Sequence, residues 1–74
     1  MNPLEREKLN RLGKKYQNAK FARRYLEHLI YYMRADDVSY IDEQQFATLE
    51  KAIEIVDGLR HKFRAELKAH GVEV

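Results

Sequence analysis

Apolar side chains recur at steps of three and four residues through the second half of this chain. The members of this stripe are Phe46, Leu49, Ile53, Val56, Leu59, Phe63 and Leu67. Such spacing places them on one face of an amphipathic helix. Ala52 and Ile55 flank the stripe and widen it beyond the arc of about 100° that packing against one neighbour requires. We therefore expect this helix to contact more than one other helix.

A helix is also predicted from the start of the chain. Asn2 is a suitable N-cap, Pro3 fits the first helical turn, and Glu5 stands three residues after the cap. Gly13 interrupts the pattern at a cost of about 1 kcal/mol relative to Ala, and we expect the helix to continue through it. Its second part is rich in apolar residues, which are Phe21, Ala22, Tyr25, Leu26, Leu29, Ile30, Tyr32 and Met33.

Polar residues mark the junction between the two helices and the end of the second. Asp36 and Asp37 favour a turn, and Asp42 followed by Gln45 has the spacing of a capping box. Gly71 suits the position just after a helix C-terminus. The last three residues are expected to form a loose tail.

These signals predict an all-α protein with a single domain over residues 1–74. Helices at about residues 3–35 and 43–69, joined by a short connection, form an antiparallel two-helix hairpin. Because two helices alone cannot cover stripes this wide, we expect a homodimer that forms a four-helix bundle. The expected dimer interface consists of Leu26, Leu29, Ile30, Met33, Ile53, Val56, Leu59 and Phe63.

Charge is distributed unevenly along the chain. Residues 1–35 carry nine Lys or Arg and three acids, a balance of +6, whereas residues 36–74 carry five and nine, a balance of −4. A basic first helix could bind nucleic acid, but it could equally face the acidic second half within the hairpin. We favour the internal pairing.

The sequence contains no arrangement typical of an enzyme or a cofactor site. It has no cysteine and no Gly-rich phosphate loop, nucleophile elbow or HExxH motif. Asp57 and His61, like Glu66 and His70, share a helix face, but a zinc site requires three or four convergent ligands. We interpret these pairs as surface electrostatics and expect a non-enzymatic protein without cofactor or metal. No apolar run is long enough to span a membrane, so a cytoplasmic location is expected.

Aromatic and cationic residues are concentrated in the second part of the first helix. A four-helix bundle leaves one side of each helix in water, so some of these residues must remain exposed. Tyr and Arg are enriched at protein interfaces. The predicted partner-binding residues are Lys20, Arg23, Arg24, Tyr31 and Tyr32.

One stretch is similar to a known family. Met33 and Arg34, a short acidic turn, and the segment 49–56 resemble the small hairpin co-chaperones that hold type III secretion needle subunits. In that family a helical hairpin shields an aggregation-prone helical partner, whereas the basic first helix seen here has no counterpart. The size and charge also resemble those of small phage-encoded proteins that inhibit a host protein.

Taken together, these features favour a small protein-binding module that acts as a helical-hairpin homodimer and inhibits, escorts or tethers its partner. The first alternative is a nucleic-acid-binding regulator that uses the basic first helix. The resemblance implies a further alternative, a secretion-type co-chaperone.

Overall fold

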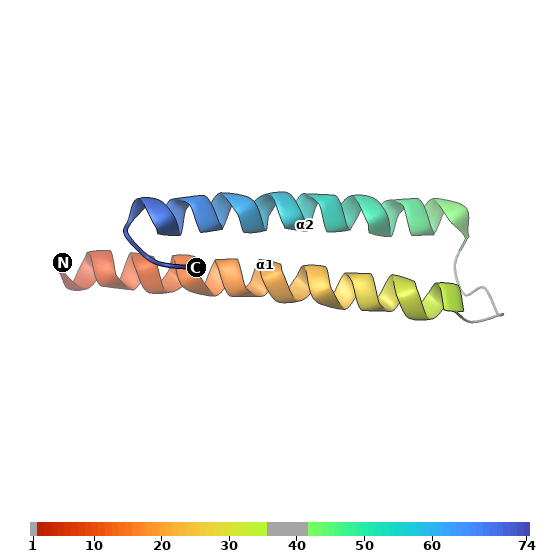
Figure 1. Cartoon of the computed structure of the whole chain (residues 1–74), viewed down its shortest axis with the longest axis horizontal. Helices are drawn as coiled ribbons and strands as arrows, with labels where there is room; N and C mark the ends of the chain where they lie inside the picture. The colour runs from red at the N-terminus through yellow and green to blue at the C-terminus, as the bar shows by residue number, and fades with distance from the viewer. Residues whose placement is uncertain (1, 36–41) are drawn as a thin grey trace.

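The computed structural model shows two long antiparallel helices that pack side by side (Figure 1). The structure describes residues 2–35 and 42–74. Helix α1 covers Pro3–Ala35 and helix α2 covers Glu43–Ala69. The all-α hairpin predicted from the sequence is confirmed, with both helices at the expected bounds. The predicted turn residues Asp36 and Asp37 lie outside the described residues.

Local hydrogen bonds fix the helix N-termini. The Asn2 side chain accepts a bond of 2.8 Å from the Glu5 backbone N–H. At the start of α2, the Asp42 side chain accepts from the Gln45 backbone N–H at 2.8 Å, and the Gln45 side chain accepts from the Asp42 backbone N–H at 2.9 Å. These bonds satisfy donors that have no partner inside a helix. Both predicted N-caps are confirmed, and α1 continues through Gly13.

The C-terminus of α2 ends in a Schellman motif. Gly71 adopts a φ of 82°, which lets the chain reverse. The Val72 and Gly71 backbone N–H groups then donate to the carbonyls of Leu67 and Lys68 at 3.0 and 2.9 Å. Val72 is half-buried, and Arg64 donates to the Val74 carbonyl at 3.4 Å. The prediction of a loose tail was therefore wrong, because the last residues turn back toward α1 (Figure 1).

The contact between the helices follows a seven-residue repeat, which we call the seam. Alternating steps of three and four residues keep a stripe facing a neighbouring helix in a coiled coil. The seam positions, all buried or half-buried, are Leu9, Leu12, Tyr16, Ala19, Arg23, Leu26, Ile30 and Met33 on α1, and Phe46, Leu49, Ile53, Val56, Arg60, Phe63 and Leu67 on α2. Two of these positions hold arginine, and the remainder are apolar.

The two sides of the seam differ in character. On one side, Arg34 pairs with Glu50 and Arg23 pairs with Asp57. On the other side, Lys8 and Lys15 of α1 line a hollow together with Glu66 of α2. Since residues seven apart in a seam share the same side, each side can be followed along the whole hairpin.

Candidate functional site

An ionic layer crosses the seam where its two arginines lie. Arg23 Nη1 is 3.1 Å from Asp57 Oδ1, and Arg60 Nη2 is 3.0 Å from the same oxygen. The Glu27 carboxylate accepts a second bond from Arg23 Nε at 3.0 Å. The Arg60 side chain is only 15% exposed, so its charge depends on Asp57 for compensation. The hydrogen bond from Arg60, together with the charges of Arg23, Arg60 and His61, lowers the pKa of Asp57, and desolvation only partly opposes this.

A basic hollow opens beside this layer. It has a volume of about 380 Å³ and is lined by Lys20, Phe21, Arg23, Arg24, Glu27 and Arg60. The four cations exceed the two nearby acids, Glu27 and Asp57, so the hollow keeps a positive balance. Ion pairs fix the guanidinium groups of Arg23 and Arg60, whereas Lys20 and Arg24 have no ion pair within the described part of the chain. The hollow is thus suited to an anionic group such as a carboxylate.

Three of the five predicted partner-binding residues meet in this hollow: Lys20, Arg23 and Arg24. Tyr31 lies seven residues after Arg24, on the same side of α1 and about 10 Å further along it. Tyr32 lies toward the other side of the seam. The Tyr31 and Tyr32 rings are 5.4 Å apart in an edge-on arrangement, and both side chains are exposed.

Arg60 is a lining residue that the sequence interpretation did not single out. From the sequence of α2 alone, Arg60 would be interpreted as one more surface cation, because the predicted apolar stripe contains Leu59 and Phe63 and omits Arg60. The strict alternation of three- and four-residue steps would have placed Arg60 in the seam. Its closeness to Lys20 and Arg24 depends on how the two helices align, which neither helix encodes alone.

The predicted dimer residues divide into two groups in the structure. Six of them occupy seam positions between α1 and α2 of one chain, namely Leu26, Ile30, Met33, Ile53, Val56 and Phe63. Leu29 and Leu59 remain 43% and 42% exposed. Contact of any of the eight with a second chain stays a prediction.

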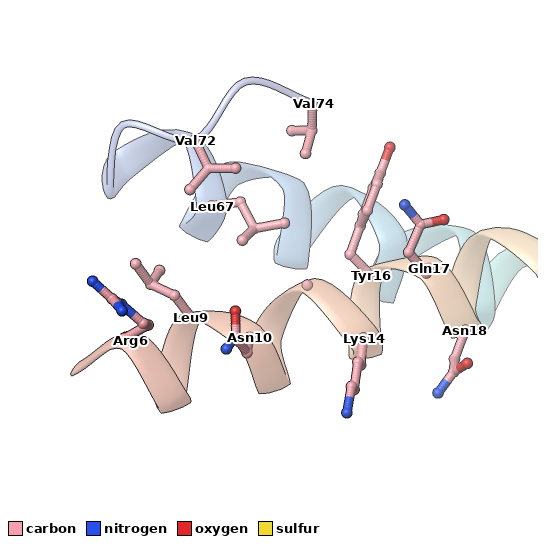
Figure 2. A pocket seen from close by; sticks show the side chains of 11 residues that line it. Arg6, Leu9, Asn10, Lys14, Tyr16, Gln17, Asn18, Leu67, Val72 and Val74 are labelled. Atoms are coloured by element: carbon pink, nitrogen blue, oxygen red, sulfur yellow. The ribbon is translucent and has the colours of Figure 1, made fainter. Parts of the chain in front are cut away.

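A second hollow lies near the ends of the chain (Figure 2). It has a volume of about 640 Å³, and the side chains of Leu9, Leu67 and Val72 point toward one another at its base, whereas Lys14 points away (Figure 2). Tyr16 and Val74 border it. We interpret it as the open end of the hydrophobic core, because apolar side chains form its base and only two charged residues, Arg6 and Lys14, belong to its lining.

The possible metal ligands do not converge. His61 Nε2 lies 3.4 Å from Asp57 Oδ2, but within residues 2–35 and 42–74 no three His, Asp or Glu side chains form a group that could hold a metal ion. Nor does either helix have a stretch long and apolar enough to cross a membrane.

Comparison with known proteins identifies no relative. No protein-family model, curated protein or solved structure matches the chain.

Proposed function

We propose that this protein is a non-enzymatic binding module that holds an acidic region of a partner protein against the basic hollow and Tyr31. The observation that supports this most directly is the convergence of four cations from both helices around one concavity. Arg23 and Arg60 are held there by Asp57 and Glu27, so little conformational entropy is lost when they bind.

The composition of the surface also favours a protein partner. Arg and Tyr contribute strongly to protein interfaces because they bring large contact area together with directional hydrogen bonds. Tyr31 is 67% exposed, so its ring is available to a partner on the same side of α1, about 10 Å beyond Arg24. Binding at this site would inhibit, escort or tether the partner.

A binding experiment with charge reversal tests this proposal. The wild-type chain is used to capture partners from nuclease-treated lysate of the source cells, alongside the variant Lys20→Glu/Arg24→Glu. We expect the variant to lose the captured protein, because the reversal turns attraction of an acidic surface into repulsion. Lys51→Glu is the control, since it adds negative charge to an exposed position of α2 outside the hollow.

The control variant should retain the partner, and circular dichroism should show equal helix content in all three proteins. If the double variant captures the same partner as strongly as the wild type, the hollow is not the binding site.

A nucleic-acid-binding regulator is the second candidate. In the described part of the chain, only Arg23 and Arg34 of the nine α1 cations pair with acids of α2, so the internal pairing favoured from the sequence neutralises few of them. The other cations are distributed around α1, however. Lys8 and Lys15 lie on one side of the seam, and Lys20 lies on the opposite side. A duplex contact needs its cations on one face, which makes this the weaker candidate.

Salt dependence separates the two candidates. Binding to random duplex and single-stranded DNA or RNA should be weak, and affinity for nucleic acid that falls steeply with salt would favour the second candidate.

A further inference from the structure

An apolar face runs along both helices on the side of the seam opposite the basic hollow. Its residues are Ala22, Tyr25, Leu29 and Tyr32 on α1, and Ala52, Ile55 and Leu59 on α2. Lys15 of α1 and Glu66 of α2 line one hollow on this side of the seam. Leu29 lies 14 residues after Lys15, and Leu59 lies seven residues before Glu66. The seven-residue repeat therefore places Leu29 and Leu59 on one common face.

This face is exposed although it carries no charge. Tyr25, Tyr32 and Ile55 are 68%, 66% and 58% exposed. Charged residues begin only beyond it, at Lys15 on α1 and at Lys62 and Glu66 on α2. Contiguous apolar surface of this kind marks an interaction site, and burying it requires no charge to be desolvated.

The amount of exposed surface indicates how large the missing contact is. The chain exposes 6104 Å² and has a mass of 8.9 kDa. A folded monomer of that mass exposes about 4,800 Å², so the excess is roughly 1,300 Å². The radius of gyration is 16.3 Å, whereas about 11 Å is expected for a compact domain of this length. The hairpin is thus elongated and leaves more surface in water than a compact domain of its mass.

We infer that a second copy of this chain covers the apolar face and that the two hairpins form a four-helix bundle. A stable dimer needs about 800 Å² from each partner, and the excess surface exceeds this. A two-fold axis brings the same face of both copies together, so an uncharged strip meets another uncharged strip. The tyrosines and the aliphatic residues of the face are then removed from water without leaving an unpaired charge.

Such a dimer does not require the proposed function, and it leaves the basic hollow accessible. Since the hollow lies on the other side of the seam, packing of the apolar faces displays it once on each outer side. The interface also differs from the one expected from the sequence. Leu29 and Leu59 are common to both, whereas the other six expected residues lie in the seam. The residues added are Ala22, Tyr25, Tyr32, Ala52 and Ile55.

Sedimentation equilibrium of the full chain at micromolar concentrations tests the inference. We expect twice the chain mass of 8.9 kDa for the wild type. Ile55→Lys/Leu59→Lys should raise the dissociation constant by about 30-fold or more, because it buries two charges at the centre of the interface. Ala47→Lys/Ala65→Lys is the control, since it adds the same charge to exposed positions of α2 outside the face, and it should remain dimeric.

A wild type that stays monomeric at these concentrations overturns the inference, as does an Ile55→Lys/Leu59→Lys variant that dimerises as tightly as the wild type. If that variant does not fold, Ile55→Ala/Leu59→Ala takes its place, and a dimer of unchanged affinity overturns the inference equally. The melting temperature of the wild type should rise with protein concentration, because dissociation accompanies unfolding. A melting temperature independent of concentration would contradict a dimer.

Discussion

Leu67 is the residue whose truncation should destabilise the hairpin most clearly. It is only 2% exposed, the lowest value in the described part of the chain. It is the last seam residue of α2 and lies close to the C-terminal residues Val72 and Val74 (Figure 2). Its carbonyl also accepts the Val72 backbone N–H at 3.0 Å. The Leu67 side chain lies close to that of Val72, next to the reversal that ends α2 (Figure 2). Leu67→Ala removes this side chain from the core. Because Ala has at least as high a helix propensity as Leu, any loss of stability reflects lost packing.

The size of the effect follows from the buried surface. Leu→Ala removes about three methylene equivalents, each contributing about 0.8 kcal/mol when fully buried, which gives roughly 2.4 kcal/mol. A cavity normally adds to this value. Here Leu67 borders the hollow of about 640 Å³, so neighbouring side chains and water can fill part of the space. We therefore expect a loss of about 2.5 kcal/mol, near the lower end of such substitutions.

Urea denaturation followed by far-ultraviolet circular dichroism measures this loss. All proteins should be compared at one concentration, because the melting of a dimer depends on concentration. Leu4→Ala is a matched control, since Leu4 lies in α1 but is 62% exposed, and it should change stability by no more than about 0.5 kcal/mol. If Leu67→Ala also stays within about 0.5 kcal/mol of the wild type, Leu67 does not lie in the core.

Two further predictions concern the helix glycines and the ionic layer. Gly58→Ala should stabilise the protein by about 0.5 to 1 kcal/mol, because a helical Gly costs backbone entropy, and nothing lies within 4 Å of the added Cβ. Gly71→Ala should destabilise it by about 1 kcal/mol or more, because φ is positive there; thermal melts that reverse this order would contradict the assignment of the C-cap. Asp57 has a pKa held low chiefly by its bond to Arg60, so its contribution to stability is present at neutral pH and is lost as the pH falls through the lowered pKa. Asp57→Asn should therefore be less stable than the wild type at neutral pH and equally stable in strong acid, whereas the exposed Glu54→Gln should show no such difference; an Asp57→Asn deficit that persists in acid would exclude the ionic explanation.

The helices could be predicted from the sequence because their ends are encoded locally. Each of these ends depends on a residue within four positions of the backbone that it affects. The side chains of Asn2 and Asp42 accept hydrogen bonds from backbone N–H groups of the first helical turn, and Gly71 allows the chain to reverse after α2. Such contacts form in the same way whatever the helix later packs against. The conformation of Val72 and Val74 was missed because it depends on α1, a long-range contact that short apolar tails do not encode.

The division of apolar residues between the seam and the exposed face could not be read from either helix alone. Leu26 and Leu29 stand three residues apart, and an amphipathic pattern includes both. Only the pairing of α1 with α2 turns Leu26 inward and leaves Leu29 exposed. Similarly, the sequence singled out Lys20, Arg23 and Arg24 as partner-binding residues, but it did not indicate that Arg60 of α2 lies beside them.

The ionic layer explains why these cations converge. Apolar seam positions repeat every seven residues, so a slide of one helix by seven residues, about 10 Å, would keep most apolar residues in contact. Such a slide would break the ion pair between Arg23 and Asp57 and place Arg60 beside Tyr16 or Ile30, whereas the pair of Arg60 with Asp57 lies within α2 and would move with it. A polar seam residue selects one alignment in this way, at some cost in stability. The same alignment brings Arg60 next to Lys20 and Arg24, so the contact that fixes the register of the hairpin also builds the hollow proposed to bind its partner.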